Sequence, residues 1–180
     1  MILTYSDCIK KYKSDYQIRK QISLHKLYKI EPGIYSDKKY ESCTAVVMNK
    51  YPRAVFTLNS AFYYQGLTDT IPQKYYLLTD KDDAKISDKR IKQCFDNYSS
   101  MDIGVEIIEY NDDEIRVFSK ERLLIELVRN RKKLAFDYYK EIIGNYRKII
   151  YELDFQAIEE YAEKLPKTEL VMNTIKMEVL

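Results

Sequence analysis

The fold is decided by the stretch TYSDCIKKYKSDYQIRKQISLHKLYKIEPGIY at residues 4–35. Thr4 is followed three residues later by Asp7, a spacing that is typical of a helix N-terminus, because each side chain can bond the backbone N–H of the other. We expect this first helix to end near Tyr12. The residues that follow this helix decide between a parallel helix bundle and a helix-turn-helix.

A second helix start follows almost at once. Ser14 and Gln17 have capping-box spacing, and Ile18, Ile22 and His25 fall on one face at helical periodicity. On this face we expect His25 to be a packed, hydrogen-bonded core residue with no chemical role. Two short amphipathic helices with so tight a join favour a helix-turn-helix over a parallel bundle.

The helices are followed by two short runs of strand character, residues 27–30 and 34–36, joined by Glu31-Pro32-Gly33. Proline fixes one turn dihedral and glycine supplies the positive one, so the pattern predicts a β-hairpin that serves as a wing. The whole pattern predicts an α+β fold: a winged helix-turn-helix head at 1–40 and a mixed α/β body at 41–180.

The body opens with the apolar runs 45–48 and 51–56, followed by a helical stretch at 58–65 that Gly66 ends. The patterns further along predict strands at 75–79, 103–110 and 115–118, a turn at 111–113, a helix that Ser119 caps, and helices near 137–151, 155–164 and 168–178.

Charge is distributed unevenly along the chain. The net charge is +2, but residues 1–40 contain nine Lys or Arg against four acids, a net of +5, and the remainder has a net of −3. A basic head on a nearly neutral body indicates a polyanionic partner for the head.

Composition argues against several classes of protein. Cys8, Cys43 and Cys94 are widely spaced and odd in number, so we expect reduced, packed thiols, and the single histidine leaves no partner for a His-based metal site or a nucleophile–histidine pair. No apolar run approaches the ~18 residues of a membrane span, and no export signal is evident. We expect a cytoplasmic, non-enzymatic protein with no catalytic residues, metal, cofactor or membrane partner.

Two acidic clusters, at residues 80–83 and 112–114, loosely resemble metal-binding carboxylate patterns, but aspartate accumulates in turns for backbone reasons, which is the interpretation we prefer. The basic cluster Arg129–Lys133 closes a predicted helix, where the helix dipole favours cations. A second nucleic-acid surface at this cluster is the alternative, and the sequence leaves both open.

The face of the second helix opposite its apolar residues carries side chains that suit DNA. Gln and Arg can make paired hydrogen bonds to purine edges in the major groove, whereas Lys and Ser mainly hold phosphates. The predicted DNA-binding residues are Ser14, Tyr16, Gln17, Arg19, Lys20 and Ser23 in or beside the major groove, and Lys26, Lys38 and Lys39 on phosphates.

Three stretches resemble the AbiEi family of antitoxins from type IV toxin–antitoxin, or abortive-infection, systems. Residues 29–35 resemble the family's wing with its Gly-x-Tyr ending. The segment from Pro52 through 59–61 and 66–69 to Pro72 is similar to the family's Pro…Ser-Ala-Leu…His-Gly-Leu-Thr-Asp…Pro pattern. Residues 115–127 are similar to its Glu-Arg-Thr-Leu-x-Asp-Leu helix.

The resemblance implies a role in phage resistance. Proteins of this family repress their own operon by binding inverted repeats in double-stranded promoter DNA, which requires two heads and hence self-association or cooperativity on DNA. They also counteract a nucleotidyltransferase-like toxin, generally without a stable complex. Two alternatives remain open: an enzymatic body that reverses or blocks the toxin's modification, and an adaptor whose winged helix binds a protein.

Overall fold

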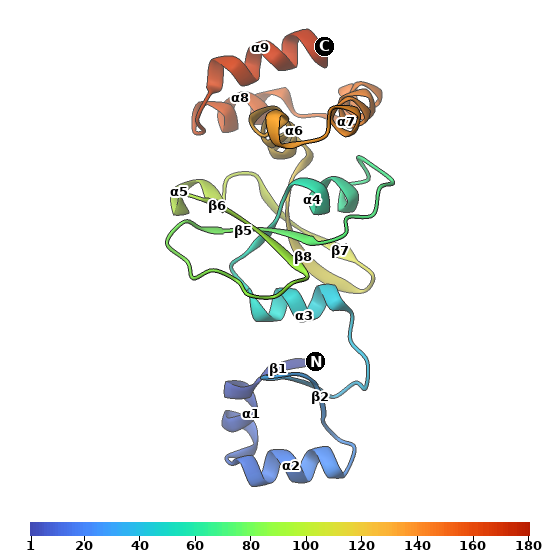
Figure 1. Ribbon diagram of the computed structural model, residues 1–180, viewed down its shortest axis with the longest axis vertical. Coiled ribbons are helices and arrows are strands. Elements are labelled where there is room, and N and C mark those ends of the chain that lie inside the picture. The colour runs from blue at the N-terminus through green and yellow to red at the C-terminus, as the bar shows by residue number, and fades with distance from the viewer. The chain divides into compact units, whose positions relative to one another are not determined.

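The computed structural model describes all residues, 1–180, and has an α+β architecture with two separate β-sheets (Figure 1). The chain divides into two compact units. The first comprises Met1–Arg53 with Glu109–Ile115, and the second comprises Ala54–Ile108 with Arg116–Leu180. The predicted boundary at residue 40 falls in the connection that follows the last strand of the first sheet, and the division into 1–40 and 41–180 stays a prediction.

The first unit combines short helices with a small antiparallel sheet of strand order β1-β3-β2. Its elements are β1 (Ile2–Thr4), α1 (Tyr5–Tyr12), α2 (Asp15–Ser23), β2 (Tyr28–Glu31), β3 (Ile34–Ser36) and α3 (Cys43–Lys50). The predicted helix, turn, helix and hairpin are therefore present. Strand β1 was not predicted. It pairs with β3, 30 to 34 residues further along the chain, and a three-residue strand has no periodicity of its own.

Local signals account for both helices. At the start of α1 the N–H of Asp7 donates to Thr4 Oγ1 (3.2 Å) and the N–H of Thr4 donates to Asp7 Oδ2 (3.0 Å), a complete capping box. Lys13 ends α1 in the left-handed region at φ 70°. Ser14 then begins α2 by accepting from the N–H of Gln17 (3.3 Å). The turn between the helices is sharp because the C-cap of α1 is followed directly by the N-cap of α2.

A small core holds the helices on the sheet. It consists of buried Cys8, Ile18, Leu27 and Tyr35, against which Leu3, Ile9, Tyr12 and Ile22 pack. The predicted apolar face of α2 is thus confirmed for Ile18 and Ile22. Each helix contributes to this core, so the arrangement of α1 and α2 depends on hydrophobic burial as well as on the caps.

Two predictions about individual residues were wrong. His25 is exposed at φ 55° because α2 ends at Ser23, before the helical face would reach it, and its ring lies 6.4 Å from that of Tyr28. Cys43 is also exposed, since it is the first residue of α3 and faces solvent; Cys8 is buried and Cys94 is half-buried. The apolar run 45–48 lies within α3, which Ser42 caps.

The second unit is built around a mixed five-stranded sheet of order β6-β5-β4-β8-β7. Strand β4 pairs antiparallel with β5 and parallel with β8, and β5 pairs parallel with β6. The elements are β4 (Val55–Phe56), α4 (Leu58–Tyr64), β5 (Tyr75–Asp80), β6 (Ile91–Asp96), α5 (Tyr98–Met101), β7 (Val105–Tyr110), β8 (Asp113–Phe118), α6 (Lys120–Arg129), the 3-10 turns Arg131–Lys133 and Ile150–Glu152, α7 (Phe136–Lys148), α8 (Phe155–Glu163) and α9 (Thr168–Glu178).

Helix α6 is the central helix of the second unit. Its residues from Arg122 to Val128 are all buried, and it packs against α4, α8 and α9. Ser119 caps it by accepting from the N–H of Arg122 (3.3 Å), as the sequence predicts. Strand β6 and helix α5 were not predicted. No helix of the chain is both long enough and apolar enough to cross a bilayer.

Candidate nucleic-acid interface

The face of α2 that the sequence assigns to DNA is turned to solvent. Tyr16 is 72% exposed, and Arg19 and Lys20 are exposed beside it, whereas Ile18 on the opposite face is 2% exposed. Gln17 is half-buried. The helix therefore separates an apolar face in the core from a polar face that is free to meet a partner.

The two serines of the predicted set have internal partners. Ser14 Oγ accepts from the N–H of Gln17, and Ser23 Oγ donates to the carbonyl of Lys20 (2.8 Å). These hydrogen bonds fix the two ends of α2. The Ser14 hydroxyl can still donate to a phosphate, whereas the Ser23 hydroxyl already uses its only hydrogen.

The remaining predicted residues gather at one end of the hairpin. Tyr28 lies opposite Ser36 in the sheet, so Lys26, which precedes β2, and Lys38 and Lys39, which follow β3, lie at the same end. All three lysines are exposed. The hairpin turn lies at the other end.

That turn is held against the first helix. Gly33 adopts φ 80°, and its carbonyl accepts from the N–H of Tyr5 (2.8 Å) at the start of α1. The basic side chains of the hairpin therefore lie at its base and not at its tip.

Every acidic side chain of residues 1–40 is engaged within the first unit. Asp7 belongs to the α1 cap, Asp15 accepts from the Tyr5 hydroxyl (2.9 Å), Glu31 pairs with Lys50 (3.2 Å), and Asp37 pairs with the N-terminal ammonium. The hydrogen bonds from Thr4 lower the pKa of Asp7, and the bond to Asp15 raises the pKa of Tyr5.

The basic side chains behave in the opposite way. All nine are exposed and none forms an ion pair: Lys10, Lys11, Lys13, Arg19, Lys20, Lys26, Lys29, Lys38 and Lys39. Lys11 and Lys39 only lie over neighbouring tyrosine rings, at 5.4 Å each. The positive charge of this segment is therefore not neutralised by its own acids.

Four of these cations lie outside the predicted site. Lys10, Lys11 and Lys13 are at the end of α1 and in the turn, and Lys29 is in β2. The charge count of the sequence included them, but the helical-face argument considered only α2. Of these four, Lys13 lies in the turn between the two helices.

The second basic cluster, Arg129–Lys133, is largely used internally. Arg129 pairs with Glu126 and with Asp96 (3.6 Å), and Arg131 pairs with Glu178 (2.7 Å) while lying over a tyrosine ring. These partners support the structural interpretation of the cluster and leave Lys132 and Lys133 as its exposed ends.

The acidic clusters organise turns. The N–H of Asp82 donates to Asp80 Oδ1 (2.9 Å), the N–H of Asp80 donates to Asp83 Oδ2 (3.2 Å), and Asp113 accepts from the Ser42 hydroxyl. Nowhere in the chain are three His, Cys, Asp or Glu side chains grouped as metal ligands.

Comparison with known proteins gives a fold but no family. No protein-family model matches the chain, and no curated protein matches it. Among solved structures, the chain is similar to the crystal structure of the RV2827C protein from Mycobacterium tuberculosis, with a TM-score of 0.67 over 98% of this chain and 71% of that one. The two share a fold. At 9% identity, the similarity extends no further than architecture.

Proposed function

We propose that this protein is a DNA-binding transcriptional repressor whose first 40 residues act as a winged helix-turn-helix. The observation that carries the proposal is the contrast between nine exposed, unpaired basic side chains and four acids that are all engaged internally. A surface of this kind attracts a polyanion, and each cation that meets a phosphate releases a counterion.

In this proposal α2 is the recognition helix. Arg19 and Gln17 read base edges in the major groove, and Tyr16 and Lys20 border them. Ser14 and Ser23 contact the backbone at the two ends of the helix. The three lysines at the base of the hairpin, Lys26, Lys38 and Lys39, hold phosphates and fix the register of the helix on the duplex.

We further propose that the repressor is the antitoxin of a type IV toxin–antitoxin pair and represses its own operon. This rests on the resemblance of three sequence stretches to AbiEi antitoxins. On this proposal the toxin is a nucleotidyltransferase-like protein encoded beside the antitoxin, and it is counteracted without a stable complex. Promoter DNA with inverted repeats recruits two copies of the chain.

A gel-shift titration against the protein's own upstream region tests DNA binding. The Arg19→Ala/Lys20→Ala variant should bind at least about tenfold more weakly, and the log–log salt slope should become shallower by about one for the lost phosphate contact of Lys20. The matched control is Lys132→Ala/Lys133→Ala, a consecutive exposed pair in the second unit, which should bind as the wild type does. Equal loss in both variants, or no wild-type shift, would refute the proposal.

Antitoxin activity needs a separate assay. The wild type and the Arg19→Ala/Lys20→Ala variant, both expressed from an unrelated promoter, should protect cells equally from the neighbouring toxin, and neither should retain the toxin in a pull-down. Toxin that copurifies with the chain would instead favour an adaptor.

A further inference from the structure

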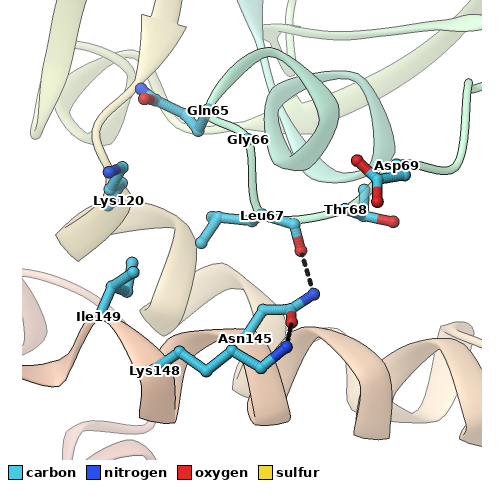
Figure 2. Close-up of a pocket in the computed structure, with 9 residues that line it drawn as sticks. All are labelled: Gln65, Gly66, Leu67, Thr68, Asp69, Lys120, Asn145, Lys148 and Ile149. Atoms are coloured by element: carbon cyan, nitrogen blue, oxygen red, sulfur yellow. Dashed lines mark hydrogen bonds between the residues drawn. The ribbon is translucent and has the colours of Figure 1, made fainter.

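The second unit contains a polar pocket that the DNA-binding proposal does not use (Figure 2). It encloses about 200 Å³ between three segments that are distant in sequence: the turn after α4, the start of α6 and the end of α7. Its lining consists of residues 65–69 together with Lys120, Asn145, Lys148 and Ile149.

The turn after α4 forms a fixed wall. Gly66 adopts φ 69° and has no atom within 4 Å of the place where a Cβ would lie, so its backbone borders open space. The N–H of Leu67 donates to the carbonyl of Phe62 (2.8 Å). Asn145 Nδ2 donates to the carbonyl of Leu67 (3.0 Å), as Figure 2 shows. The wall is thus ordered before any ligand arrives.

The opposite parts of the lining carry two cations on different helices. Lys148 Nζ bonds only the neutral Asn145 Oδ1 (2.8 Å), and the nearest carboxylate to Lys120 is Glu152 at 3.7 Å, which is 64% exposed. Gln65 Nε2 donates both of its hydrogens, one to the carbonyl of Phe118 (2.9 Å) and one to the Glu106 carboxylate, and Asp69 is the one carboxylate of the lining. Neither lysine is therefore neutralised by a close, buried acid.

We propose that this pocket binds the phosphate group of a small molecule, with Lys120 and Lys148 as its two cations. Two ammonium groups from separate helices balance the charge of a dianion, and the second N–H of the Asn145 amide supplies a hydrogen-bond donor. The volume lies below the ~300 Å³ at which pockets for drug-sized ligands begin, so the pocket has room for a phosphate group but not for a whole nucleotide. The source is inorganic phosphate or the phosphate end of a nucleotide.

The site is independent of the proposed DNA interface, because all of its residues belong to the second unit. The chain has four glycines, which makes selective ¹⁵N-glycine labelling of the full-length protein a direct probe. Gly66 lines the pocket and Gly144 precedes Asn145, whereas Gly33 lies in the hairpin of the first unit. Phosphate binding should move the Gly66 and Gly144 signals and leave Gly33 in place.

The titration uses inorganic phosphate, ATP and adenosine. Saturable shifts of Gly66 with phosphate and ATP at similar Kd identify phosphate as the ligand, and saturation with ATP alone identifies a nucleotide. Saturation with adenosine, or no saturation with any probe, would overturn the proposal. Because DNA binding is scored separately in the gel shift, failure here leaves the repressor proposal standing.

Paired variants locate the site. Lys120→Gln/Lys148→Gln should weaken binding of the successful probe by about tenfold or more. The control is Lys164→Gln/Lys176→Gln, which removes the same charge from exposed positions of the second unit outside the pocket. It should change Kd less than about twofold, because only screened, long-range attraction to the phosphate is lost. Equal weakening in the two variants would show nonspecific attraction and refute the site.

Discussion

Arg122 has the largest side chain among those that the protein buries completely, and its contacts explain why the start of α6 cannot be a simple surface helix. Its guanidinium donates to the carbonyls of Ser100 (3.1 Å) and Ile103 (3.2 Å), pairs with Glu126 (2.9 Å), and lies 4.5 Å from the centre of the Phe118 ring. Burial lowers the pKa of Arg122, and Glu126 opposes that shift. Arg122 therefore ties α6 to the segment before β7.

Arg122→Met should lower the free energy of unfolding by about 3 kcal/mol, because two buried carbonyls lose their donor and Glu126 loses one of its cations. The comparison is Arg116→Met, which breaks a partly exposed pair with Asp102 and should cost less than about 1 kcal/mol. Urea unfolding of both variants measures the difference. Equal losses would mean that the Arg122 contacts add nothing beyond surface pairing.

Gly104 has the closest surroundings of the chain's four glycines. A Cβ there would lie 2.6 Å from Arg122 Cβ, and the residue has φ 66°. Gly104→Ala should therefore cost more than Gly66→Ala, which has the same positive φ but open space, by about 1–3 kcal/mol for the clash. Thermal unfolding of the two variants isolates the clash from the backbone strain, and indistinguishable midpoints would contradict it.

At the scale of elements, the cap of α1 links stability to pH. The folded-state pKa of Asp7 is lowered from 3.8 by the hydrogen bonds of Thr4, so this group stabilises the fold above pH 3.8 and loses that effect as pH falls through the folded pKa. Asp7→Asn should be less stable than the wild type at pH 7, and the gap should close on acidification. Asp69→Asn, an exposed residue outside any helix cap, is the control. A gap that is unchanged with pH would contradict the assignment.

Elements with local signals were predictable and elements with remote partners were not. The caps at Thr4 and Ser14, the Pro32-Gly33 turn and the stop at Gly66 each depend on a few adjacent residues, and all are present. Strand β6 was missed because its only partner is β5, and the charged residues before it obscure any alternation. Helix α5 is four residues long, too short for a periodic pattern.

The two sites differ in the same way. The exposed polar face of α2 was predictable because it belongs to one helix with a regular repeat of 3.6 residues. The hydrogen bonds and ion pairs of the acidic side chains could not be predicted, because Asp15 and Glu31 meet their partners Tyr5 and Lys50 only in the folded unit. The pocket was invisible to sequence because three segments between residues 65 and 149 meet only in the tertiary fold.

At the scale of the whole molecule, the repressor proposal fixes a stoichiometry. An inverted repeat presents two half-sites, so a DNA complex should contain two 21.5 kDa chains and a single half-site should hold one. Light scattering on complexes with full and half-site duplexes measures this directly. A complex with one chain on the full repeat would mean that recognition does not follow the symmetry of the site.

Alkaline pH should unfold the protein through its buried tyrosines. Burial raises the pKa of Tyr146 well above 10.0, and its hydroxyl donates to the carbonyl of Lys120 (2.8 Å). Only the unfolded chain releases this proton readily, so the contribution of Tyr146 is complete below pH 10.0 and falls as pH rises towards the folded pKa, with a slope of up to about 1.4 kcal/mol per pH unit.

Tyr146→Phe should lose about 1 kcal/mol at pH 7 with the hydrogen bond, yet become less sensitive to alkali than the wild type, because no proton remains to be released. Tyr151→Phe removes a hydroxyl from a fully exposed ring five residues further on and should reproduce the wild-type curve. Denaturant unfolding between pH 8 and pH 11 measures all three proteins. If Tyr146→Phe kept the wild-type slope, the alkaline transition would have to arise at other buried tyrosines, of which Tyr139, with its bond to Glu178, is the next in line.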